Sequence, residues 1–122
     1  MNIIIVGFGF IGKETVRALY NKIDTIKRLD EEFRIVGISD SKGYVYDEKG
    51  LNLEKFINIE RLSDYTAYNE GGSAEELIEE RDVDLMVEAT PTNIENGEPG
   101  LTFIRKALKR GIHVVTSIRD RS

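Results

Sequence analysis

The sequence predicts an α/β protein built on a doubly wound, mostly parallel sheet. Short apolar runs alternate along the chain with amphipathic segments, and no internal repeat or low-complexity linker interrupts the pattern. Strands separated by helices need crossover connections, which is why the sheet is expected to be mostly parallel. The length of 122 residues has room for one ordinary domain, which we assign to residues 1–122, and not for a two-domain enzyme.

The first half of the chain carries the clearest signals. Residues 3–6 form a β-branched, unbroken apolar run that ends at Gly7, as expected of a strand covered on both faces. Over residues 11–29, apolar side chains recur at helical spacing with charged residues between them, which predicts a long amphipathic helix. A second strand is predicted over residues 33–38, followed by a polar turn over residues 39–43.

Start and stop signals define the later elements. A short helix over residues 73–80 begins with a capping-box pattern, and a further helix lies between Pro99 and Gly111. Strand character returns at residues 83–89 and 113–116. The glutamates of the short helix are expected to form a solvated face: Glu75, Glu76, Glu79 and Glu80.

The stretch between residues 43 and 72 has the weakest pattern. Residues 53–62 are predicted as a helix, but the tyrosines of this stretch follow no period. These tyrosines are Tyr44, Tyr46, Tyr65 and Tyr68.

Composition and charge exclude several classes of function. With 22 acidic and 17 basic residues, a formal charge of −5 and no basic block, we expect neither a nucleic-acid partner nor an anionic membrane partner. No apolar run approaches the roughly 20 residues of a membrane span, and no secretory signal is recognised, which favours a cytoplasmic protein. With no cysteine and a single histidine, His113, we expect neither a metal site nor a Ser-His-Asp triad. His113 itself is interpreted as a strand-end residue.

A glycine motif joins the first strand to the first helix. Residues 7–12 read Gly-Phe-Gly-Phe-Ile-Gly, a G-x-G-x-x-G at the place of a dinucleotide-binding turn. Gly7 permits the tight turn, Gly9 lets the backbone approach a pyrophosphate, and Gly12 lets the helix pack closely. The helix N-terminus adds unpaired N–H groups and a partial positive charge. We therefore predict a Rossmann-type domain that binds NAD or NADP, rather than glycines that only form a turn.

The turn after the second strand bears on the choice of cofactor. Asp40 lies where an acidic side chain accepts hydrogen bonds from the adenosine ribose, which favours NAD. Lys42 could instead pair with a 2′-phosphate, with Ser41 donating a hydrogen bond, which favours NADP. The third interpretation is an ordinary polar turn.

A second polar segment follows the predicted strand over residues 83–89. Thr90, Pro91, Thr92 and Asn93 should lie at the carboxyl edge of the sheet, where open α/β folds bind their ligands. The alternative is a proline-terminated loop whose Asn and Thr side chains satisfy local backbone groups.

Several segments together carry a family resemblance. They are residues 4–12, residues 36–43, and the distinctive run Thr-Pro-Thr-Asn-Ile-Glu-Asn-Gly-Glu-Pro-Gly at residues 90–100, followed by residues 104–116. In these segments the chain resembles the amino-terminal NAD(P)-binding domain of homoserine dehydrogenases, over residues 1–117. Members of that family interconvert homoserine and aspartate semialdehyde by hydride transfer at the nicotinamide.

The resemblance implies three groups of cofactor-binding residues. The pyrophosphate group is Gly7, Gly9, Phe10, Ile11 and Gly12. The adenosine group is Asp40, Ser41 and Lys42. The nicotinamide group is Thr90, Pro91, Thr92 and Asn93.

The resemblance also implies what the sequence lacks. The family carries its amino-acid substrate, its catalytic residues and much of its dimer contact on a second domain that is absent here, so no catalytic residue is assigned. The family usually continues with Asn-Lys-Gly-Pro-Leu, whereas residues 118–122 read Ile-Arg-Asp-Arg-Ser. The codons AAT AAG GGA CCG CTC, read from their second base, encode this ending. We hypothesise a single-base frameshift, which sequencing the gene through the codon of Ser122 tests.

Two functions therefore stay open. The first is the cofactor domain of a homoserine dehydrogenase-like oxidoreductase, inactive alone and able to self-associate through the surface that the missing domain leaves. The second is a freestanding nucleotide-binding module that acts as a sensor or as a partner subunit. A phosphorylating aldehyde dehydrogenase is excluded because its nucleophile is a cysteine.

Overall fold

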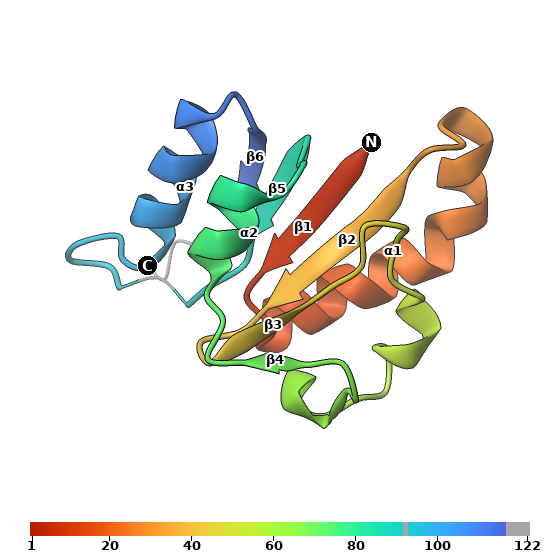
Figure 1. Cartoon of the computed structure of the whole chain (residues 1–122), viewed down its shortest axis with the longest axis horizontal. Coiled ribbons are helices and arrows are strands. Elements are labelled where there is room, and N and C mark those ends of the chain that lie inside the picture. Colours follow the sequence, from red (N-terminus) through yellow and green to blue (C-terminus); the bar gives the residue numbers. More distant parts are fainter. Residues whose placement is uncertain (92, 117–122) are drawn as a thin grey trace.

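The computed structural model describes residues 1–91 and 93–116, which form an open six-stranded sheet with helices on both faces (Figure 1). The strands are β1 (Asn2–Val6), β2 (Arg34–Ser39), β3 (Gly43–Tyr46), β4 (Asn69–Glu70), β5 (Leu85–Glu88) and β6 (His113–Thr116). The helices are α1 (Phe10–Leu29), α2 (Ala74–Glu80) and α3 (Gly100–Lys109), and two single 3₁₀ turns are η1 (Leu53–Lys55) and η2 (Leu62–Asp64).

The strand order is β4-β3-β2-β1-β5-β6. Strand β1 pairs in parallel with β2 and with β5, and β5 pairs in parallel with β6. Only β3 and β4 are antiparallel to their neighbours among the described strands. The predicted mostly parallel, doubly wound α/β fold is thus confirmed, and the carboxyl ends of four parallel strands meet at one edge of the sheet.

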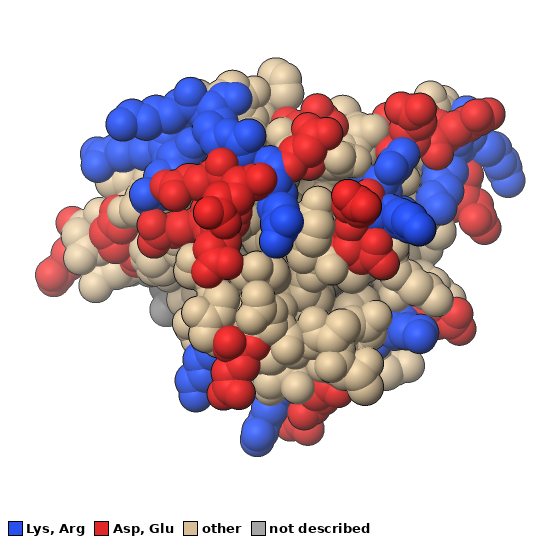
Figure 2. All heavy atoms as spheres, viewed as in Figure 1, with Lys and Arg blue, Asp and Glu red and all other residues tan. Residues whose placement is uncertain are grey.

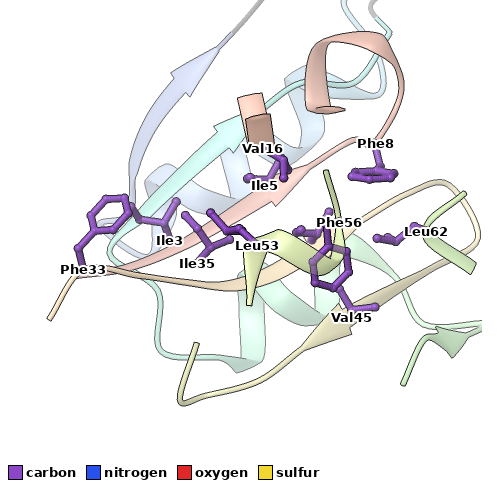
Figure 3. Packing of buried hydrophobic residues seen from close by; sticks show 11 residues of the cluster. Ile3, Ile5, Phe8, Val16, Phe33, Ile35, Val45, Leu53, Phe56 and Leu62 are labelled. Carbon is purple, nitrogen blue, oxygen red and sulfur yellow. The ribbon is translucent and has the colours of Figure 1, made fainter. Parts of the chain in front are cut away.

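The central strand β1 is buried on both faces because its side chains alternate between two cores. Ile3 and Ile5 join the core under α1, where Ile5 lies beside Val16 of that helix (Figure 3). Ile4 and Val6 join the opposite core, which α2 and α3 cover. An unbroken apolar strand is what a sheet with helices on both faces requires.

Most predicted elements lie within one or two residues of their observed positions. Helix α1 begins at Phe10 rather than at residue 11 and ends, as predicted, at Leu29. The second strand is shifted by one residue, to 34–39, and β5 is shorter than the predicted 83–89. No helix within the described residues is long and apolar enough to cross a membrane. Residues 118–122, with the altered tail, lie outside the described residues.

The predicted helix over residues 53–62 is wrong. That stretch holds η1 and is followed by η2, and the chain between them is irregular. Its buried side chains, Leu53, Phe56 and Leu62, all pack into the core under α1. Because they lie on separate turns, these side chains are buried by packing against the sheet and not by forming one apolar face of a helix.

Two glutamates on the acidic face of α2 pair with a lysine of α3. Figure 2 shows basic side chains gathered over α3 directly beside acidic ones over α2. Lys106 of α3 lies 3.2 Å from a carboxylate oxygen of Glu75 and 2.6 Å from one of Glu79, which raises the pKa of this lysine. The two helices on this face are therefore joined by charge as well as by apolar packing.

We expect Phe56→Ala to destabilise the domain by about 3–5 kcal/mol, since it removes a large, fully buried ring. The ring also packs against Tyr65, with a distance of 4.6 Å between the ring centroids. Leu29→Ala is the control, because Leu29 is exposed at the end of α1 and its replacement should change stability by less than about 0.5 kcal/mol. Urea unfolding followed by circular dichroism measures both; equal stabilities would contradict the expectation.

Candidate functional site

A cavity of about 450 Å³ opens at the carboxyl edge of the sheet, between the ends of β1 and β2 and the loop after β5. Its wall consists of Val6, Gly7, Phe8, Gly9, Ser39, Asp40, Ser41, Ser73, Ala74, Thr90, Pro91, Pro99 and Phe103. The volume lies in the range of small-molecule sites. This edge, at the point where the strand order reverses, is where open α/β sheets bind ligands.

Gly7 and Gly12 are needed for the backbone to pack at all. Gly7 has a φ of +111°, and a Cβ there would lie 2.7 Å from the carbonyl carbon of Ala89. A Cβ on Gly12 would collide with the carbonyl oxygen of Gly7. The motif therefore brings the start of α1 against the end of β1, and both against the segment that follows β5.

Gly9 has a different role from its two neighbours in the motif. It is the N-terminal cap residue of α1, its backbone is extended, and a Cβ built on it meets no atom within 4 Å. It lines the cavity, so the space beside it belongs to the cavity. A side chain at Gly9 would therefore extend into open space without a clash.

The first turn of α1 is left without a side-chain cap and without an acidic residue. Its backbone N–H groups and the positive end of the helix dipole are therefore available to an anion. The motif residues Phe10, Ile11 and Gly12 lie in this turn and are not part of the cavity wall, and Phe10 is exposed.

Asp40 and Ser41 lie on the cavity wall, at the end of β2. One carboxylate oxygen of Asp40, Oδ1, accepts hydrogen bonds from the backbone N–H groups of Lys42 and Gly43, each at 2.9 Å. The same oxygen accepts the hydroxyl of Tyr68 at 2.7 Å. Burial and this bond raise the pKa of Tyr68 well above its ordinary value. Asp40 therefore forms the polar turn and also lies on the cavity wall.

Only some of the binding residues predicted in the loop after β5 lie on the cavity wall. Thr90 and Pro91 lie on the cavity wall, whereas Thr92 lies outside the described residues. Asn93 is not part of the wall: its side-chain oxygen accepts the N–H of Glu95 at 2.9 Å, and its carbonyl accepts the N–H of Gly97 at 2.7 Å. Asn93 thus shapes the turn that leads toward α3.

Glu88 lies outside the cavity wall but holds one of its residues, a role that the sequence analysis did not predict. It is fully buried at the end of β5, and its carboxylate accepts the N–H and the hydroxyl of Thr90 and the hydroxyl of Thr116, the last at 2.8 Å. A Cβ on Gly100 would lie 2.9 Å from its Oε1, so the carboxyl group lies against the N-terminus of α3. The helix dipole favours a negative charge at that place.

Ser39 is the second residue that was missed. It is fully buried at the end of β2, it lines the cavity, and its hydroxyl finds no hydrogen-bond partner among the described residues. Buried hydroxyls are usually paired, so this one fits a polar ligand atom in the cavity. Its position as the last residue of a strand next to the glycine motif was the available signal.

The described residues hold no cluster of three metal-binding side chains, and His113 is exposed at the start of β6. That end of a parallel strand faces the edge of the sheet opposite the cavity. His113 is thus the first residue of its strand, which agrees with its interpretation as a strand-end residue.

Curated relatives of the chain are homoserine dehydrogenases. The enzyme of Methanocaldococcus jannaschii is 46% identical over 121 residues, which are 96% of this chain and 36% of the relative. The NAD(+)-dependent homoserine dehydrogenase of Pseudomonas canavaninivorans is 32% identical over 119 residues, which are 93% of this chain and 34% of that protein. The chain therefore spans about a third of the length of the relatives it matches.

Solved structures agree with these relatives. A structure described as a homoserine dehydrogenase of Archaeoglobus fulgidus matches 97% of this chain and 34% of its own, with a TM-score of 0.77 and 30% identity. The homoserine dehydrogenase of Thermoplasma acidophilum matches 95% of this chain and 34% of its own, with a TM-score of 0.71 and 28% identity.

A family model described as the NAD-binding domain of homoserine dehydrogenase matches residues 7–117. This match begins at the glycine motif and runs through the loop after β5 to the end of β6. It confirms the cofactor class expected from the motif, NAD or NADP. The chain therefore belongs to the family of homoserine dehydrogenase NAD-binding domains.

Proposed function

We propose that this chain is the cofactor-binding part of an oxidoreductase that interconverts homoserine and aspartate semialdehyde. The observation that carries the proposal is the uncapped N-terminus of α1, whose cap residue Gly9 lines the cavity at the carboxyl edge of the sheet. Helix N-termini of this kind bind the pyrophosphate of a dinucleotide. We also propose that the protein works in the cytoplasm, where its cofactor is abundant.

The residues of the cavity fit a dinucleotide along its length. Gly9 and the first turn of α1 would hold the pyrophosphate, while Asp40 and Ser41 would bind the adenosine ribose. The hydroxyl of Ser39, buried without a partner among the described residues, would meet a polar atom between them. When bound, the cofactor supplies the redox chemistry, and this chain orients it.

The nicotinamide end of the site is proposed for the loop after β5. Thr90 and Pro91 form that wall of the cavity, and Glu88 holds Thr90 through its backbone N–H and its hydroxyl. Thr92 and Asn93 stay predictions at the nicotinamide end. Phe10 and Ile11 stay predictions at the pyrophosphate end, and Lys42 stays one at the adenosine end. The amino-acid substrate and the catalytic groups would come from the two thirds of the relatives' length that this chain does not match.

We expect Gly9→Val to abolish saturable NAD(H) and NADP(H) binding, since its side chain would fill space that the pyrophosphate needs. Because that space is open, the variant should fold with a stability loss of no more than about 1 kcal/mol. Gly9→Ala adds one methyl group to the same space and should weaken binding less. NADH fluorescence titration and urea unfolding measure the two effects, and wild-type affinity in Gly9→Val would contradict the site.

We expect no homoserine-dependent reduction of NAD or NADP by the purified 122-residue chain. A chimera should restore it, in which residues 1–116 replace the matching part of the Methanocaldococcus jannaschii relative. Absorbance at 340 nm reports turnover, and the same chimera with Gly9→Val is the inactive control. Turnover by the chain alone would refute the first expectation. A chimera that binds cofactor without turnover would favour the alternative, a freestanding nucleotide-binding module.

We further propose that the isolated chain self-associates through apolar surface near this edge. Phe10, Ile94 and Val115 are large apolar side chains with 71%, 75% and 53% exposure. Exposed apolar surface of this kind drives association when its usual cover is missing. Sedimentation velocity of the isolated chain should show dimers or larger species that Phe10→Ser and Ile94→Ser shift toward monomer. A monomer at all concentrations would refute the proposal.

A further inference from the structure

The hydroxyl of Tyr68 is bonded to the residue that faces the adenosine end of the cavity. Tyr68 lies between η2 and β4, outside the cavity wall, and its hydroxyl donates to Oδ1 of Asp40 at 2.7 Å. With the N–H groups of Lys42 and Gly43, this makes three donors on a single carboxylate oxygen. Among residues 1–91 and 93–116, no hydrogen bond reaches the other oxygen, Oδ2.

The local backbone is built to admit the tyrosine. A Cβ on Gly43 would collide with the carbonyl oxygen of Asn69 and lie 2.6 Å from the hydroxyl oxygen of Tyr68, so a side chain at this position would displace both β4 and the tyrosine. The pairing of Gly43 with Glu70, and the bond from the N–H of Gly71 to the carbonyl of Lys42 at 2.8 Å, hold β4 beside the turn. The turn and the tyrosine therefore form one unit, although they are far apart in the sequence.

The charges around this unit are mainly negative. Asp40 and Glu70 both act on Tyr68 and favour its protonated form, so the phenol stays a donor at neutral pH. Glu76 lies on the side of the second core, where its carboxylate accepts the hydroxyl of Tyr44 at 3.0 Å. Lys42 is the cation of the turn, and its side chain is exposed. A 2′-phosphate would enter a region with more negative than positive charge.

We propose that Tyr68 is a positioning residue that makes the site select NAD over NADP. By occupying Oδ1, Tyr68 and the two backbone N–H groups prevent the carboxylate of Asp40 from turning away, and they leave Oδ2 for a ribose hydroxyl. A carboxylate held in this way accepts a hydrogen bond from a free 2′-hydroxyl and repels a phosphate at the same place. The inference rests on the proposed function, since it assigns the adenosine end of the same site.

The test compares the dissociation constants of NADH and NADPH for the wild-type chain and for Tyr68→Phe. We expect the wild type to bind NADH at least about tenfold more tightly than NADPH, and Tyr68→Phe to lose most of that preference, chiefly through weaker NADH binding. Tyr65→Phe is the matched control, since Tyr65 lies in the same loop and contacts Phe56 rather than Asp40. Its ratio of dissociation constants should equal that of the wild type.

A double-mutant cycle separates positioning from a general structural effect. Asp40→Asn should lower the preference by itself, and adding Tyr68→Phe to it should change the ratio no further, because Tyr68 acts through the carboxylate. Circular dichroism establishes that each variant is folded. Should Tyr68→Phe fail to fold, equal binding of both cofactors by the wild type would still refute the inference.

The outcomes distinguish this inference from the proposed function. A wild-type chain that binds neither cofactor contradicts the proposed function itself. A wild-type chain that binds NADH and NADPH equally, or a Tyr68→Phe variant with an unchanged ratio, contradicts only the role of Tyr68. An equal change of the ratio by Tyr68→Phe in the presence and absence of Asp40 would also overturn it.

Discussion

The architecture depends on close contacts between backbone segments at Gly7 and Gly12, where a side chain would clash. The carbonyl oxygen of Gly7 occupies the place where a Cβ of Gly12 would lie, and the backbone of Ala89 occupies the place of a Cβ on Gly7. Strand β1, helix α1 and the segment after β5 approach one another only because these positions lack side chains. This approach directs the N-terminus of α1 toward the cavity, so the core of the fold and the site share one constraint.

The two ends of the cavity are supported in different ways. Regular elements build the proposed pyrophosphate end, where β1 and α1 follow each other directly. At the proposed adenosine end, the turn after β2 is held by β4 and by Tyr68. Phe56 and Leu62 bury the irregular stretch before β4 in the core. Apolar packing some distance from the cavity thereby fixes the position of a charged group on its wall.

The sequence predicts structural features that have a periodic or local pattern. It does not predict contacts between distant residues that follow no pattern. The strand over residues 3–6, the helix that ends at Leu29 and the glycine motif each carry their signal within a short window. The bond between Tyr68 and Asp40 joins positions 28 apart with no pattern between them. Phe56 and its neighbours are buried from separate turns, so no helical or strand period marks them. Ser39 and Glu88 are polar at strand ends, where burial depends on neighbouring strands.

Glu88 connects two parts of the molecule that are distant in the sequence. One carboxylate holds Thr90 on the cavity wall and Thr116 at the end of β6, and it is wedged against the start of α3. A displacement of β6 would therefore pull on the loop beside the proposed nicotinamide end. The position of Thr90 on the cavity wall therefore depends on the last described strand of the sheet as well as on β5, because one buried carboxyl group joins the ends of both strands.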